Sequence, residues 1–129
     1  MEVRLARPKS KNLTEAELRL MNVVWRLGRG TVGAVVDALQ GKPALAYNTV
    51  LTTLRILEAK GYLRHTKEGR AFIYEPLVGR KQASSNAMRY LVSRFFGGSP
   101  AQLVMNLLEE EEIDQKELQR IKKRISESE

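Results

Sequence analysis

The chain has 129 residues, which is the length of one domain or of one domain with an appendage. It contains no cysteine, so disulfides, thiolate metal sites and cysteine nucleophiles are excluded, and a reducing compartment is expected. No apolar run approaches the roughly 18 residues that cross a bilayer, and the charged N-terminus lacks the apolar core of a secretion signal. We therefore expect a cytoplasmic protein without membrane contact, metal or cofactor.

The positive charge is concentrated in the first part of the chain. The net charge is +7, of which residues 1–81 carry +8 and residues 82–129 carry −1. A basic first part joined to a near-neutral second part favours a polyanion-binding head attached to an assembly module. A basic surface that serves solubility alone is the alternative, and charge does not decide between the two.

The first elements in chain order are an arm and a helix. Residues 1–12 have no apolar period and are expected to form a flexible basic arm. Its basic residues are Arg4, Arg7, Lys9 and Lys11. Thr14 and Glu17 form a capping-box pattern, which predicts that a helix begins at Thr14. Gly28 and Gly30 are expected to end this helix.

Two more helices follow. Thr31 is a suitable N-cap for a helix over residues 31–40, which Gly41 would stop. A third helix is predicted from about Ala46 to Lys60, with Gly61 at its end.

A hairpin pattern comes next. Residues 62–66 and 71–75 read as strands around a turn at residues 67–70, and Pro76 closes the second strand. Three helices and a hairpin predict a mainly α, α+β winged-helix domain over residues 13–78, with a two-stranded ribbon as the wing.

Residues 79–129 are predicted to be a helical dimerisation segment. A helix over about residues 81–96 ends at two glycines, Ser99 and Pro100 start another helix, and a last helix covers about residues 114–126. The apolar residues of this segment are too many for three short helices to bury alone. They are Leu91, Phe95, Leu103, Leu107, Leu118, Ile121 and Ile125. Pairing with a second copy would remove them from water, and packing on the N-terminal domain is the alternative.

The third helix carries the sharpest functional pattern. At about 100° per residue, one face is apolar and is predicted to face the core. Its members are Val50, Leu54, Leu57 and, nearby, Ala46. The opposite face carries short hydrogen-bonding side chains and one long cation. Its members are Asn48, Thr49, Thr52 and Arg55. Such a face suits the major groove of DNA, where Asn and Arg pair with adenine and guanine edges.

A basic ribbon follows this helix directly. Arg64, Lys67 and Arg70 surround Gly69, and the single histidine, His65, lies among them. Such a wing is suited to the phosphate backbone of DNA, and Thr31 is a further candidate backbone contact. A solvated helix face and a solubilising hairpin are the alternatives. The order of the elements, with few Glu or Lys on the outward helix face, favours a reader of DNA.

In this order and spacing, these features resemble the penicillinase-repressor family, the BlaI/MecI type of bacterial winged-helix transcriptional regulators. The resemblance runs from about Leu13 to Ser126. Its markers are Leu13 to Glu17, Val24-Trp25, Asn48-Thr49-Val50, Leu57 to Leu63, Tyr74, Phe96-Gly97-Gly98 and Leu103 to Leu107. The resemblance implies a repressor that binds a palindromic operator in double-stranded DNA as a homodimer.

The resemblance also implies a release mechanism. Some family members are cleaved within the fifth helix by a sensor-linked protease, at an Asn–apolar bond that corresponds here to Asn106–Leu107. A copper-responsive branch uses C-terminal cysteines, and this chain has none.

Two other classes of function are the alternatives, an enzyme and a protein-binding adaptor. The sequence shows no nucleophile elbow, metal-ligand cluster or phosphate-binding glycine loop, so we do not expect an enzyme. A winged-helix adaptor that binds proteins and never DNA remains open, although such modules usually lack a cation-rich wing.

Overall fold

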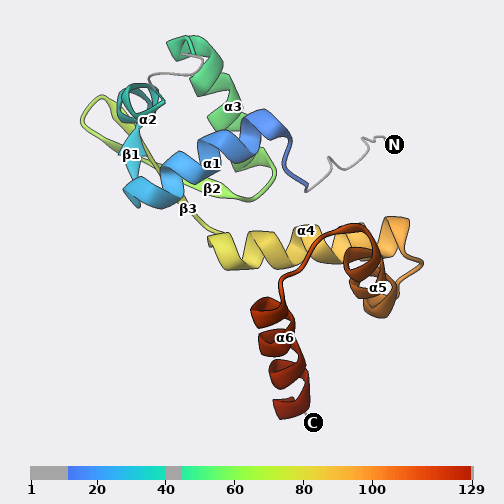
Figure 1. Ribbon diagram of the computed structural model, residues 1–129. Helices are drawn as coiled ribbons and strands as arrows, with labels where there is room; N and C mark the ends of the chain where they lie inside the picture. The colour runs from blue at the N-terminus through green and yellow to red at the C-terminus, as the bar shows by residue number, and fades with distance from the viewer. Residues whose placement is uncertain (1–11, 40–44, 129) are drawn as a thin grey trace, which may run out of the picture. The chain divides into compact units, whose positions relative to one another are not determined.

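The computed structural model describes residues 12–39 and 45–128. The chain forms two compact units, which divide between Ala87 and Met88, inside α4. The helices are α1 (Glu15–Leu27), α2 (Val32–Ala38), α3 (Tyr47–Ala59), α4 (Arg80–Phe95), α5 (Pro100–Glu110) and α6 (Gln115–Glu127) (Figure 1). The strands are β1 (Gly30–Thr31), β2 (Leu63–Glu68) and β3 (Ala71–Pro76). The expected basic arm, apart from Asn12, and the expected stop at Gly41 lie outside the described residues.

The predicted start of the first helix is confirmed in detail. The Glu17 amide donates to the Thr14 hydroxyl at 3.2 Å, and the Thr14 amide donates to the Glu17 carboxylate at 3.0 Å. These two bonds satisfy donors that a helix start leaves open. The helix ends at Gly28, whose φ of 83° lies in the left-handed region that favours glycine. Gly30 lies beyond the helix, in β1.

The sheet has three strands in the order β1-β3-β2, all antiparallel. The prediction of a two-stranded ribbon was therefore incomplete. β1 has only two residues, paired as Gly30 with Tyr74 and Thr31 with Ile73, and so short a strand has no alternating pattern in the sequence. β2 also runs to Glu68, which places Lys67 in the strand and leaves the turn to Gly69 and Arg70.

The core of the N-terminal unit is formed by α1, α2, α3 and the inner face of the sheet. Its most enclosed side chains include Leu20, Val35, Val50, Leu54 and Leu57, all 0% exposed. The start of α4 belongs to this unit. Ala83 is buried in the core, and the Trp25 indole donates to the Val78 carbonyl oxygen at 2.8 Å. The unit thus forms an enclosed apolar core from its own residues.

A buried ion pair joins the start of α1 to the end of α3. The Lys60 ammonium lies 2.7 Å from the Glu17 carboxylate, and both side chains are under 10% exposed. Lys60 also donates to the Asn12 carbonyl oxygen at 2.9 Å. Burial raises the pKa of Glu17, but the bonds from Lys60 and Thr14 outweigh it, so the pKa lies below its ordinary value.

The C-terminal unit has the predicted helix starts. Ser99 caps α5 with Pro100 in the first turn, and Asp114 caps α6. No residue of α5 or α6, both of which are described throughout, is buried. No helix in the described ranges is both long and apolar enough to cross a membrane.

Candidate nucleic-acid interface

The two faces of α3 differ in burial as well as in chemistry. Val50, Leu54 and Leu57 are 0% exposed and hold the helix on the core. The opposite face is open to solvent, and its exposed members are Asn48, Thr49, Thr52 and Arg55. Ala46 was predicted to face the core, and that was wrong. It is exposed because it stands outside the helix as its N-cap, with extended backbone.

The start of α3 differs from that of four other helices in its N-cap. The helices α1, α2, α5 and α6 each begin at a residue whose side chain caps a backbone amide, whereas Ala46 provides no such cap. Tyr47, the first residue of α3, is 54% exposed beside Asn48. The sequence reasoning missed Tyr47, although its place directly before the polar face was a usable signal.

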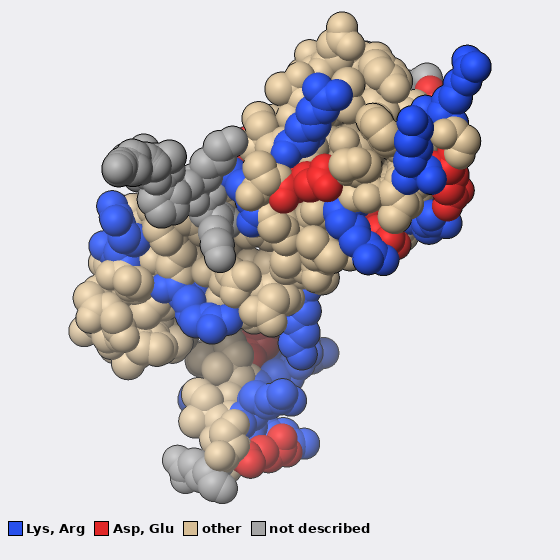
Figure 2. Space-filling model, turned by 180° about the vertical axis from the view of Figure 1, so that it is seen from behind, with Lys and Arg blue, Asp and Glu red and all other residues tan. Residues whose placement is uncertain are grey.

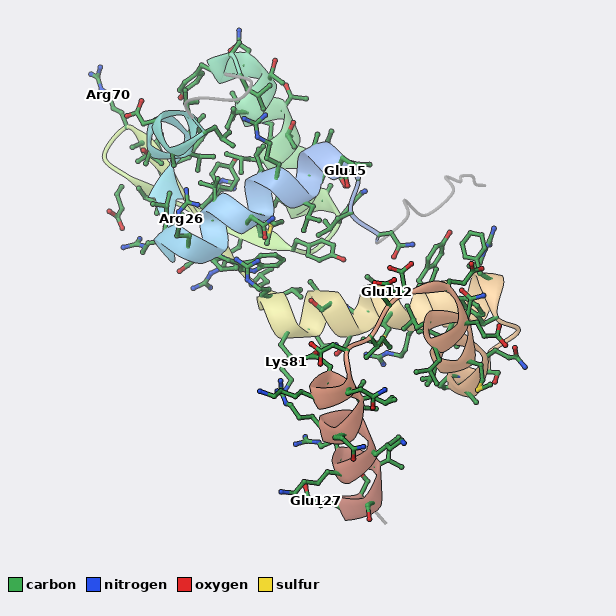
Figure 3. All side chains as sticks on the ribbon, in the orientation of Figure 1. Glu15, Arg26, Arg70, Lys81, Glu112 and Glu127 are labelled. Carbon is green, nitrogen blue, oxygen red and sulfur yellow. The ribbon has the colours of Figure 1, made fainter. Side chains whose placement is uncertain are left out.

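The wing cations have different surroundings. Arg64 lies 2.8 Å from Glu75, its cross-strand neighbour, so an acid offsets its charge. The Lys67 ammonium lies 6.0 Å from the centre of the Phe72 ring, a cation–π arrangement that leaves the charge unneutralised. Arg70 lies at the turn, and its side chain extends away from the ribbon (Figure 3). Lys67 and Arg70 are therefore better placed than Arg64 to meet a phosphate.

Thr31 performs a structural task in this fold. Its hydroxyl oxygen accepts the Ala34 amide at 3.0 Å, and its backbone belongs to β1. The side chain is half-buried. A contact with a phosphate would have to use the hydroxyl hydrogen while the oxygen continues to cap α2.

A polar cluster connects α3 with the wing. The His65 Nδ1 atom of β2 lies 2.8 Å from both carboxylate oxygens of Glu58. The charge of Arg55 acts on the hydroxyl of Tyr74, a side chain that is 1% exposed. Burial and the nearby Glu58 raise the pKa of Tyr74, against the opposing charge of Arg55. Sequence reasoning missed Glu58 and Tyr74 as site residues. Helical spacing already places Glu58 beside Arg55, whereas only folding brings Tyr74 close to it.

Basic and acidic side chains are interspersed on the surface. In Figure 2 blue and red side chains alternate over the visible face of the N-terminal unit. An ion pair joins Arg29 to Glu68 at 2.8 Å, near the end of the wing. Some of the cations counted in the sequence are thus paired with acids within the fold, and these pairs leave the net charge unchanged.

The apolar residues predicted to support dimerisation lie mostly open to solvent in the single chain. Five of the seven are at least 38% exposed, namely Leu91, Phe95, Leu107, Ile121 and Ile125. Leu103 and Leu118 are half-buried. The Asn106–Leu107 bond lies inside α5, and both residues are exposed.

Three helices, a short strand between the first two, and a closing β-hairpin define a winged-helix domain, which confirms the predicted fold class. The sequence profile of the penicillinase repressor family matches residues 13–127. The chain belongs to this family, and the resemblance found in the sequence is confirmed.

Individual relatives agree with this assignment. The penicillinase repressor of Bacillus licheniformis is 29% identical over 110 residues, which cover 85% of this chain and 86% of that protein. The methicillin resistance regulatory protein MecI of Staphylococcus aureus is 22% identical over 114 residues, or 88% of this chain and 93% of that protein. The solution structure of the DNA-binding domain of the repressor BlaI aligns with a TM-score of 0.51 and 32% identity, covering 59% of this chain and 93% of that chain.

Proposed function

We propose that this protein is a transcriptional repressor that reads double-stranded DNA with the outward face of α3. The observation that carries the proposal is the exposure of Asn48, Thr52 and Arg55 together on a helix whose other face is locked into the core. Short polar side chains and one arginine match the donors and acceptors on base edges in the major groove. The similarity to the DNA-binding domain of BlaI supports the same use of the fold.

The wing and the start of α3 would hold the backbone of the DNA. Glu75 offsets the charge of Arg64. Lys67 lies over the Phe72 ring and Arg70 extends away from the ribbon, so their charges stay available to a phosphate. Phosphate contacts of this kind position the protein and depend on salt, because binding releases counterions. Thr49 and Thr31 are further candidates for hydroxyl contacts at the edges of this surface. A protein acting on chromosomal DNA would work in the bacterial cytoplasm.

We further propose that two copies bind a palindromic operator. The exposed apolar side chains of α4, α5 and α6 are the surface that a second copy would cover. Linking two heads raises the effective concentration of the second head at its half-site, and the half-sites would be centred one or more helical turns, about 34 Å each, apart.

Selection of binding sequences from a random pool of duplexes tests the function directly. The full chain should enrich a two-fold symmetric sequence, and its affinity for the enriched duplex should fall steeply between two salt concentrations. Enrichment of an asymmetric site would contradict the dimer. The absence of any attraction to duplex DNA would leave the protein–protein adaptor as the better account.

Release from DNA is proposed to follow cleavage of the Asn106–Leu107 bond by a sensor-linked protease. A bond inside a helix must open locally before a protease can cut it, and the exposed α5 has no buried side chain that opposes opening. Cleavage would separate the C-terminal surface from the heads and remove the gain from linkage. Mass spectrometry after incubation with extract of induced cells should find a fragment ending at Asn106, and an intact chain would contradict this step.

A further inference from the structure

Four side chains from three elements meet between the proposed reading helix and the wing. Arg55 and Glu58 lie on α3, His65 on β2 and Tyr74 on β3. The His65 Nδ1 atom is 2.8 Å from both Glu58 oxygens, and the His65 and Tyr74 ring centres are 5.6 Å apart. The charge of Arg55 opposes the rise in the pKa of Tyr74, so the guanidinium is a neighbour of that hydroxyl. These residues form one connected group, which we call the Arg55 cluster.

Two possible partners compete for Arg55 within this cluster. Residues three apart on a helix are surface neighbours, so the opposite charges of Arg55 and Glu58 attract each other. A carboxylate only accepts hydrogen bonds, so the hydrogen between the two groups must be on Nδ1 of His65. His65 therefore holds the Glu58 carboxylate on the wing side.

The second partner of Arg55 leaves its charge intact. The Tyr74 hydroxyl is a neighbour of the guanidinium and can accept a hydrogen bond from it, and burial of the ring raises the pKa of this hydroxyl, which stays neutral. A neutral acceptor fixes the direction of the guanidinium without cancelling its charge. A carboxylate would fix the direction of the guanidinium but would also neutralise its charge.

We propose that His65 and Tyr74 are positioning residues that keep Arg55 free and aimed for a guanine edge, His65 by withholding Glu58 and Tyr74 by holding the guanidinium. The inference rests on the proposed function, because it assigns a base contact to Arg55. Guanine is the fitting partner, since its O6 and N7 atoms accept the two parallel bonds of an arginine. The cluster thus makes the accuracy of base reading depend on a residue of the wing.

The test compares base discrimination among variants of the full chain. Arg55→Ala first identifies the base pair whose replacement ceases to matter. His65→Ala releases Glu58, which then captures Arg55, so discrimination at that base pair should fall by about 5- to 150-fold, the range of one bidentate contact. Adding Glu58→Gln to His65→Ala removes the competing charge and should restore most of the discrimination.

The rescue separates positioning from a structural role. A double variant that discriminates no better than His65→Ala would overturn the proposal, as would a His65→Ala variant equal to wild type. If wild-type protein discriminates among no duplexes, the proposed function itself fails. Tyr74→Phe keeps the buried ring and should shift the Arg55 Nε–H signal in NMR spectra without DNA, and an unmoved signal would also count against the proposal.

Discussion

The two units of this chain differ in how far their large apolar side chains are buried. In the N-terminal unit Leu54 and Leu57 are 0% exposed, whereas in the C-terminal unit Phe95 is 72% and Ile125 is 56% exposed. Burial of a large apolar side chain contributes about 1.5–3 kcal/mol, so the first unit is stabilised from within. The exposed apolar side chains of the second unit do not provide this stabilisation in the single chain. The comparison is the basis for the proposal that a self-sufficient domain is joined to a segment whose apolar surface a second copy covers.

The largest expected effect comes from placing a charge on the uncovered surface. Ile125→Glu should prevent pairing of the two copies, because the added carboxylate would be buried in the interface. Affinity for a palindromic duplex should then fall by about 10²–10⁴-fold as linkage is lost. Sedimentation equilibrium and DNA titration measure the two effects.

Gln119→Glu is the matched control for this change. It adds the same charge to the same helix. On the helical wheel Gln119 lies about 200° from Ile121, which places it on nearly the opposite side from that apolar residue. The control should stay paired. If both variants remain paired, α6 does not belong to the dimer surface.

The second effect concerns the buried ion pair that holds α1 to α3. Lys60→Met leaves Glu17 buried without its cation and should lower the free energy of unfolding by about 3–5 kcal/mol. Urea denaturation measures the loss. Adding Glu17→Gln should recover part of it, because the uncompensated charge is then gone, and a double variant as unstable as Lys60→Met would contradict this reason.

The same pair predicts a dependence of stability on pH. Folding lowers the pKa of Glu17, so its contribution is complete above the ordinary carboxyl range. The contribution is lost as the pH falls through the lowered value. Wild-type protein should lose more stability in acid than Glu17→Gln does, and equal losses would show that Glu17 does not contribute.

A matched pair of truncations sharpens the comparison of the two units. Leu57→Ala removes a fully enclosed side chain and should cost about 2–5 kcal/mol at any protein concentration. Leu107→Ala should cost less, and its effect on the melting temperature should depend on protein concentration, because the proposed dimerisation would be linked to folding. A concentration-independent loss at Leu107 would place this residue in a core of the single chain.

The smallest effect belongs to the wing. Arg70→Ala should weaken binding to all duplexes alike and reduce the slope of log affinity against log salt by about one. Arg64→Ala is the comparison, with a smaller change expected because Glu75 already offsets that charge. A change of base preference in Arg70→Ala would show that the wing reads sequence.

Local signals in the sequence were sufficient for the helices and for both faces of α3. The capping box at Thr14, the Ser99-Pro100 start and the glycine at the end of α1 each act within a few residues, and each is where the sequence indicated. The apolar period of α3 correctly separated its buried from its exposed face, except at Ala46, which stands before the helix.

Features that depend on contacts distant in the sequence were missed. β1 exists only because Gly30 and Thr31 meet β3 more than 40 residues later. The pairings of Arg64 with Glu75, and of Glu58 with His65, likewise follow from strand register and from the packing of α3 on β2. Charge counted along the chain could not reveal which cations the fold itself would neutralise.

The central claim is that the outward face of α3 reads DNA. A variant carrying Asn48→Ala, Thr52→Ala and Arg55→Ala changes three exposed side chains and should stay folded, with a melting temperature lowered only by the loss of Arg55 beside the buried Tyr74 hydroxyl. Fluorescence anisotropy should show that it binds the selected duplex and a scrambled duplex equally weakly. A triple variant that still prefers the selected duplex as strongly as wild type does would contradict the account.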